Sequence, residues 1–262
     1  MIYDEFENPM QALLASVKRP GRYTGGEWGS FVKNMPNGER AVHICLAFPD
    51  VYEVGMSYLG YQILYSLIKT LDNADAERAY CPWPDMEREM RASGIPLTSL
   101  ESFRPLRDFD ILGFTLQYEL NATNILTMLD LGGIPLKASE RGDSAPIVIG
   151  GGGGACSPAP LEMFFDAFCI GEGEERLPEI IAVLGDLKGR PRDEKLDALA
   201  RLRNVYVPGT RARQSYGCLS APAIMRIQTS LTIRLSWRRI NLSQCGVSVP
   251  SATRSTQPWS SA

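Results

Sequence analysis

Two short apolar stretches that each run into glycines constrain the fold of this chain most strongly. Residues 147–149, Ile-Val-Ile, lead into five consecutive glycines at 150–154, and residues 167–170, Ala-Phe-Cys-Ile, lead into Gly-Glu-Gly-Glu. A short, β-branched apolar run is typical of a buried parallel strand, and glycine after it lets the backbone approach a ligand closely. A lone glycine run is equally compatible with a flexible turn. Its repetition twenty residues later favours one edge of an open α/β sheet.

The segments before and between these stretches predict further strand–helix units. Residues 40–48 and 109–116 are apolar enough for central strands, and residues 79–83 suit an edge strand because Pro82 is tolerated there. Apolar spacing predicts helices over residues 10–17, 59–71, 86–92, 125–131, 158–168 and 175–187. We therefore expect an α/β fold with a doubly wound, mostly parallel, five-stranded, Rossmann-like sheet flanked by helices.

Composition divides the chain into four parts. We expect an N-terminal extension at 1–39, the α/β domain at 40–188, and a linker or the start of another domain at 189–217. Residues 218–262 contain five Arg and no Asp or Glu, whereas residues 1–217 hold 22 basic and 30 acidic residues, a net charge of −8. This basic tail is either a disordered arm for nucleic acid or the product of a shifted reading frame. Its lack of an apolar period favours the shifted frame.

The composition also excludes several functional classes. No apolar run approaches the roughly 20 residues of a membrane helix, and the acidic N-terminus lacks the features of a signal peptide, so we expect a cytoplasmic protein with no membrane association. The six cysteines form no C-x-x-C pair, so we predict no metal site. His43 is the only histidine and lies within a strand, where a core role is favoured over catalysis.

The loops expected at the carboxyl ends of the strands are 49–57, 115–124, 150–157 and 171–175. They are rich in Gly, Ser, Thr, Asn and Tyr and hold few basic residues, which suits a large, mostly neutral ligand and makes nucleic acid an unlikely partner. No P-loop motif is present, and the glycine run follows a late strand, which argues against a dinucleotide. We assign no catalytic residue, because the carboxylates at 172, 174 and 175 also suit a helix N-terminus.

Four sequence blocks resemble the N-terminal part of radical SAM proteins that contain a B12-binding domain. The resemblance begins at RYTGGE (22–27) and covers about three quarters of the chain, and its most specific blocks are FPDVYEVGMSYLG (48–60), AERAYCPWPDME (76–87), FDILGFTLQYEL (109–120) and IGGGGGACSPAPLEMFFDAFCIGEGEE (149–175). The resemblance implies a cobalamin-binding type of α/β sheet and cobalamin, or a similar large ligand, as the partner.

The resemblance also implies specific ligand contacts. Cobalamin-binding folds carry D-x-H-x-x-G after the first strand, and here Asp50 to Gly55 keep that spacing with Tyr52 in place of the histidine, so we expect no protein imidazole below the cobalt. Thr115-Leu116 resembles the loop that meets the nucleotide tail of the cofactor, and Gly150-Gly151 resembles the glycine pair beside it. The expected cofactor-binding residues are Asp50, Tyr52, Gly55, Ser57, Thr115, Leu116, Gly150, Gly151, Gly152, Gly171, Glu172 and Gly173.

In the family that the chain resembles, a catalytic barrel follows this domain. There a C-x-x-x-C-x-x-C motif holds a [4Fe–4S] cluster that cleaves S-adenosylmethionine. This sequence lacks that motif, and the resemblance ends near residue 208. We therefore expect a cofactor domain, truncated or frameshifted before its barrel, that works with a radical SAM domain in cis or in trans. Two alternatives stay open: a non-catalytic protein-interaction module of the same fold, and a nucleotide-binding oxidoreductase or transferase.

Overall fold

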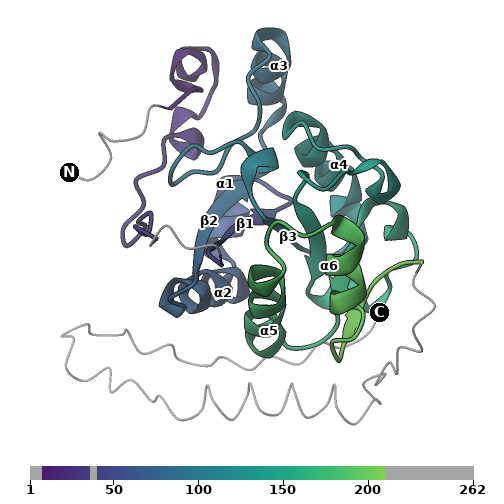
Figure 1. Cartoon of the computed structure of the whole chain (residues 1–262). Helices are drawn as coiled ribbons and strands as arrows, with labels where there is room; N and C mark the ends of the chain where they lie inside the picture. The colour runs from purple at the N-terminus through teal and green to yellow at the C-terminus, as the bar shows by residue number, and fades with distance from the viewer. Residues whose placement is uncertain (1–7, 36–39, 210–262) are drawn as a thin grey trace, which may run out of the picture. The chain divides into compact units, whose positions relative to one another are not determined.

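The computed structural model describes residues 8–35 and 40–209, so the predicted tail at 218–262 lies outside the described residues. Within them, six strands form one sheet in the order β2-β1-β3-β4-β5-β6 (Figure 1). The strands are β1 (Val42–Phe48), β2 (Ala74–Tyr80), β3 (Ile111–Thr115), β4 (Ile147–Gly151), β5 (Ala167–Cys169) and β6 (Val205–Tyr206). The first five are parallel, and β6 pairs antiparallel with β5. This confirms the predicted class, with six strands rather than five.

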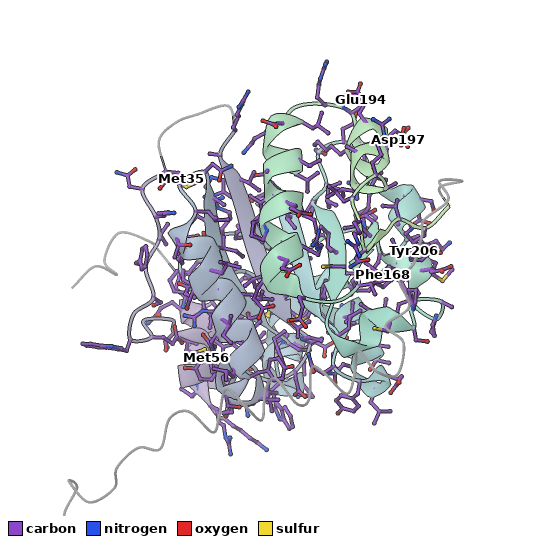
Figure 2. The ribbon with its side chains drawn as sticks, turned by 90° about the horizontal axis from the view of Figure 1, so that it is seen from below. Met35, Met56, Phe168, Glu194, Asp197 and Tyr206 are labelled. Atoms are coloured by element: carbon purple, nitrogen blue, oxygen red, sulfur yellow. The ribbon has the colours of Figure 1, made fainter. Side chains whose placement is uncertain are left out.

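The two faces of the sheet are covered by different helices, because side chains alternate between faces along each strand. One face packs against α2 (Leu59–Thr70), α5 (Gly173–Asp186) and α6 (Arg192–Leu199). The opposite face packs against α3 (Pro84–Ser93), α4 (Ala122–Leu131) and the 3-10 helix η2 (Gln11–Ser16). Figure 2 looks toward the first face, with α2 and α5 in front of the sheet. Both faces are therefore buried, as the apolar strands predicted.

The predicted α-helix at residues 158–168 is wrong. The chain between β4 and β5 forms two short 3-10 helices instead, η7 (Gly153–Cys156) and η8 (Glu162–Phe164). Pro158 and Pro160 each disfavour helical backbone at the residue before them, so a helix can begin only after both. Phe165 is then fully buried in extended backbone directly ahead of β5, which leaves too few residues for an α-helix.

The short helix predicted at residues 10–17 is the 3-10 helix η2, with bounds Gln11–Ser16. Two smaller predictions need correction. The loop predicted at 49–57 contains a short helix, α1 (Tyr52–Ser57), before α2 begins. The edge strand predicted at 79–83 is β2, which begins five residues earlier; the charged Asp75, Glu77 and Arg78 concealed it, although every residue of β2 is buried.

The chain after residue 188 continues the same sheet. Arg192 of α6 is buried, and its guanidinium donates to the carboxylate of Asp166 at 2.6 Å and to the backbone oxygens of Ala145 and Pro146. Tyr206 of β6 stacks on Phe168 with ring centroids 6.1 Å apart, as Figure 2 shows. The sheet therefore extends past residue 188, where the sequence placed the end of the domain.

The N-terminal segment 8–35 covers part of the open edge of the sheet. The backbone N–H of Lys33 donates to Asp75 of β2 at 3.1 Å, and the Lys69 ammonium lies 2.5 Å from the same carboxylate. An uncovered edge strand is a template for unwanted pairing. The N-terminal segment covers part of this edge, and further along it the backbone N–H of Leu100 donates to the Arg78 oxygen and the backbone N–H of Arg78 donates to Glu101.

The remaining 3-10 helices are η3 (Pro20–Tyr23), η4 (Leu106–Asp108), η5 (Glu119–Asn121) and η6 (Ala138–Glu140). In the described ranges, no helix is long and apolar enough to cross a bilayer.

Candidate ligand-binding slot at the carboxyl edge of the sheet

A cavity of about 270 Å³ opens between the sheet and helices α2 and α5, and we call it the slot. Its sheet wall comes from β1, β3, β4 and β5, and its helix wall comes from α2 and from the N-terminal half of α5. The residues that line the slot include Leu46, Tyr58, Gly60, Tyr61, Leu64, Gly113, Thr115, Gln117, Ile149, Gly151, Gly152, Cys169, Gly171, Glu172, Gly173, Glu174, Leu177 and Ile180.

The strand order explains why a cavity forms here. The connection from β1 runs outward to β2, whereas β3, β4 and β5 follow on the other side of β1. The loops after β1 and β3 therefore diverge, and a crevice opens at the carboxyl ends of these strands. Ligands of doubly wound sheets bind at this position.

Two strand glycines keep the floor of the slot open. A Cβ atom added to Gly151 would meet only the Cβ of Cys169, at 4.0 Å, and one added to Gly113 would meet the Leu46 side chain at 3.5 Å. Neither contact is a clash, so a side chain at Gly151 would occupy the cavity rather than collide with the protein. The floor thus has room that a larger residue would fill.

Side chains alternate between the two faces along a strand, so the predicted pairs 115–116 and 150–151 are each divided between the faces. Thr115 and Gly151 are paired in register and both line the slot. Their neighbours Leu116 and Gly150 belong to the opposite core, where a Cβ on Gly150 would come within 3.0 Å of both Leu116 and Phe168. Leu116 and Gly150, which were predicted to contact the ligand, therefore do not line the slot.

The glycine run bends around the backbone of Leu116. The Leu116 N–H donates to the Gly151 oxygen at 2.7 Å, and the Gly154 N–H donates to the Leu116 oxygen at 2.9 Å. Gly152 lies between them with φ of 96°, a left-handed conformation that favours glycine, and a Cβ there would come within 2.9 Å of the Leu116 oxygen. The run is a tight turn at the rim of the slot, not a flexible one.

The start of α5 forms the other rim. Gly171 has φ of 105°, and Glu172 is the residue before the first turn of α5. A helix N-terminus attracts phosphate groups in many nucleotide sites. Here Glu172 and Glu174 line the slot and Glu175 also lies in the first turn, so three acidic residues lie at this helix N-terminus. This arrangement opposes a ligand whose phosphates would bind at this helix.

A hydrogen bond crosses the mouth of the slot. The Tyr58 hydroxyl, from the residue before α2, donates to the Gln117 side-chain oxygen at 2.9 Å. The deeper wall is apolar and comes from Tyr61, Leu64 and Ile180. The slot therefore has a polar entrance and an apolar interior, as small-molecule sites commonly do.

The predicted β1 loop residues do not line the slot. Asp50 accepts the Val51 N–H at 2.7 Å, and the exposed Ser57 hydroxyl donates to the Val54 oxygen at 2.9 Å. Tyr52 packs edge-on against Tyr80, with ring centroids 5.4 Å apart. Burial and the nearby Glu27 carboxylate raise the pKa of Tyr52 above its ordinary value.

Gly55 has a packing role in the same loop. A Cβ on Gly55 would lie within 3.0 Å of the Tyr80 ring and of Phe48. The Asp50 to Gly55 pattern therefore seats α1 against β1 and β2 in this protein. The expectation that Asp50, Tyr52, Gly55 and Ser57 belong to the ligand site is not met by the slot.

The only histidine lies at the other edge of the sheet. His43 is the second residue of β1, at its amino end, and its backbone N–H donates to the Asp110 carboxylate at 2.8 Å. Burial lowers the pKa of His43. Within residues 8–35 and 40–209, no group of three or more His, Cys, Asp or Glu side chains is placed to hold a metal ion.

Half of the twelve predicted residues line the slot, and the sequence missed most of its helix wall. The predicted residues that line the slot are Thr115, Gly151, Gly152, Gly171, Glu172 and Gly173. Leu64 was missed because its apolar spacing indicated only a core helix. Tyr58 and Gly60 end the 48–60 block, of which only residues 50–57 were expected to contact the ligand. A glycine inside an otherwise regular strand or helix, as at Gly113 and Gly60, is a signal that could have identified them.

One comparison with known proteins covers most of the residues that line the slot. No curated protein and no solved structure matches the chain. A protein-family model does match residues 60–208, which is more than half of the chain and includes β2 to β6 with both helices that wall the slot. The chain therefore belongs to the family of radical SAM proteins, N-terminal region.

Proposed function

We propose that this domain binds cobalamin, or a ligand of similar size and chemistry, with a neutral ring system of the ligand seated in the slot. The observation that carries the proposal is the open floor at Gly113 and Gly151, which leaves space between the sheet and helices α2 and α5. The space lies at the reversal of strand order, where ligands of this sheet type bind.

The size and polarity of the slot fit the tail of such a ligand. Sites for whole small molecules measure roughly 300–1,000 Å³, so a cavity of about 270 Å³ holds one ring system and its sugar rather than a whole cobalamin. Thr115 and Gln117 supply polar groups near the entrance, and Leu64 and Ile180 supply apolar contact within. Bound cobalamin supplies organocobalt chemistry.

The cobalt would receive no histidine from this domain. Tyr52, at the position of the usual ligand, packs on Tyr80, and His43 lies at the amino edge of the sheet. The residues of this chain would therefore bind and orient the ligand through its tail. Radical chemistry would require a radical SAM domain, in cis or in trans, that the described residues do not include.

The test is to fill the slot without disturbing the core. Gly151→Val places a β-branched side chain, which a strand accepts, into the cavity. Gly153→Val is the matched control, because a Cβ at Gly153 meets nothing within 4 Å and Gly153 does not line the slot. Titration of the full chain with hydroxocobalamin, followed by visible absorption, should show uptake by the wild type and Gly153→Val and at least tenfold weaker uptake by Gly151→Val.

Two results would contradict the proposal. Uptake by Gly151→Val equal to that of the control would place cobalamin outside the slot. The absence of uptake by the wild type at high micromolar cofactor would exclude cobalamin itself.

A protein-interaction role is a second candidate, favoured by exposed apolar side chains at the same edge. Leu59 at the start of α2 is 72% exposed and Leu120 after β3 is 76% exposed. Large apolar side chains grouped near one edge often mark a partner surface. Retention of a separately produced radical SAM domain by Gly151→Val, with loss of retention in a Leu59→Ser, Leu120→Ser double variant, would support this role. A nucleotide role is less favoured, because carboxylates occupy the start of α5.

A further inference from the structure

A second cavity lies away from the slot, between the N-terminal segment and the carboxyl ends of β1 and β2. Its volume is about 480 Å³, and we call it the arm pocket. It is lined by Lys18, Arg19 and Arg22 of the N-terminal segment, by Glu53 of α1, and by Trp83 and Asp85 at the start of α3. None of these residues lines the slot, so the arm pocket is independent of the function proposed above.

Two guanidinium groups of the arm pocket meet on one carboxylate. Arg19 Nη1 donates to Glu53 Oε1 at 2.8 Å, and Arg22 Nε lies 2.9 Å from Glu53 Oε2. Planar guanidinium groups recognise carboxylate and phosphate oxygens in this way. The Glu53 side chain is 43% exposed and can rotate toward solvent, where it leaves the exposed Arg19 at little cost and the 10% exposed Arg22 at a larger one.

The other carboxylate of the arm pocket is fixed. Asp85 accepts the Lys18 N–H at 3.0 Å and the Met86 N–H at 2.8 Å, which holds it at the first turn of α3. If Glu53 turns outward, three cationic side chains face one carboxylate. The arm pocket then carries a net positive charge that suits an oxyanion.

An aromatic wall completes the arm pocket. The Arg22 guanidinium lies over the Trp83 ring, 5.2 Å from its centroid, and the Trp83 side chain remains 48% exposed. The backbone N–H of Trp83 donates to the Tyr23 hydroxyl at 3.0 Å, which fixes this residue relative to the N-terminal segment. A pocket of this volume has room for more than a bare phosphate, and the exposed Trp83 ring offers apolar contact to an organic group.

We propose that the arm pocket binds an organic phosphate, whose phosphoryl group replaces the Glu53 carboxylate between Arg19 and Arg22. Glu53 then acts as an internal competitor that holds the two arginines in place when the ligand is absent. A phosphate monoester carries more negative charge than a carboxylate near neutral pH, so it displaces Glu53 where a carboxylate does not. The organic part of the ligand lies along Trp83.

Calorimetric titration of the full chain with phenyl phosphate at low ionic strength tests this site. Glu53→Gln removes the competing charge and should tighten binding about fivefold, since the exposed Arg19 pair contributes modestly and the less exposed Arg22 pair somewhat more. Glu89→Gln is the matched control, because it removes one carboxylate of α3 that pairs with Arg88 and does not line the arm pocket. Arg19→Gln, at a side chain that is 68% exposed and so not needed for folding, should weaken binding at least fivefold.

Each arm of the experiment can overturn the proposal. Equal affinities for Glu53→Gln and Glu89→Gln would show that Glu53 does not compete, and unchanged binding by Arg19→Gln would place the anion elsewhere. Inorganic phosphate should bind more weakly than phenyl phosphate, and phenol should not bind. If inorganic phosphate binds as tightly as phenyl phosphate, the Trp83 wall has no part in the site.

Discussion

The two ends of the carboxyl edge of the sheet differ, although the sequence predicted a ligand loop at each. At the β1–β2 end, α1 is packed so closely that a Cβ on Gly55 would collide with Tyr80 and Phe48. At the β3–β5 end, a Cβ on Gly151 would enter an open slot. The difference teaches that a glycine in a ligand loop serves either close packing or open space, and that its neighbours decide which.

The largest effect should come from closing the space at Gly55. Gly55→Ala forces a methyl group within 3.0 Å of the Tyr80 ring, which is buried and donates its hydroxyl to the Met56 sulfur. Such overpacking costs about 1–3 kcal/mol, and we expect the upper part of that range. Urea denaturation measures it, with Gly153→Ala as a control that should stay within about 0.5 kcal/mol of wild type. A loss at Gly55 no larger than the control would show that α1 is loosely held.

The next effect concerns the buried charges beside Tyr80. Glu101 accepts from the side chain and the backbone N–H of Arg78, each at 2.7 Å, and burial raises the pKa of Glu101 to about 7 although Arg78 opposes the shift. The folded protein then holds a proton that the unfolded chain, with a pKa near 4.5, releases earlier. Stability from Glu101 is therefore largest below about pH 4.5 and declines as the pH rises to about 7.

Comparison with Glu101→Gln isolates this contribution. The difference in unfolding free energy between wild type and Glu101→Gln should fall by on the order of 2 kcal/mol from pH 4.5 to pH 7, measured by urea denaturation at each pH. A difference that rises over this interval would show that Arg78 keeps Glu101 ionised in the folded protein. A constant difference would show that Glu101 has the same pKa in both states.

The adjacent glycines of β4 offer the sharpest test of the two faces. Gly150→Ala should lose about 1–2 kcal/mol of stability, because its Cβ would lie 2.8 Å from Leu116 and 3.0 Å from Phe168. Gly151→Ala should change stability by less than about 0.5 kcal/mol, because its Cβ enters the slot. Thermal or urea unfolding of the two variants measures the contrast, and equal losses would contradict the open floor.

The smallest expected effect is at the mouth of the slot. Tyr58→Phe removes the hydrogen bond to Gln117, which is exposed to solvent and should contribute about 0.5 kcal/mol. Cobalamin uptake should be unchanged or faster in this variant, because the bond crosses the entrance. Stopped-flow absorption measures the association rate, and a slower rate would instead indicate that Tyr58 contacts the ligand.

The linear sequence was sufficient for the class of fold, and it placed the predicted ligand loops at the carboxyl ends of the strands, where the slot lies. Apolar runs that end in glycine, such as 147–151, depend on short-range patterns that a buried parallel strand imposes. The helices α2, α4 and α5 were predicted close to their observed bounds for the same reason. β2 was predicted only in part, because Asp75, Glu77 and Arg78 are polar residues whose burial depends on distant partners such as Lys69 and Glu101.

The tertiary structure alone decided which predicted residues face the slot. A period of two places neighbours such as Thr115 and Leu116 on opposite faces, and the sequence does not say which face carries α2 and α5. It also decided that Tyr52 packs on Tyr80 instead of facing the ligand edge, because the short helix α1 turns that side chain toward β2. Backbone class follows from local pattern, whereas the occupant of each space depends on contacts between residues far apart in the chain.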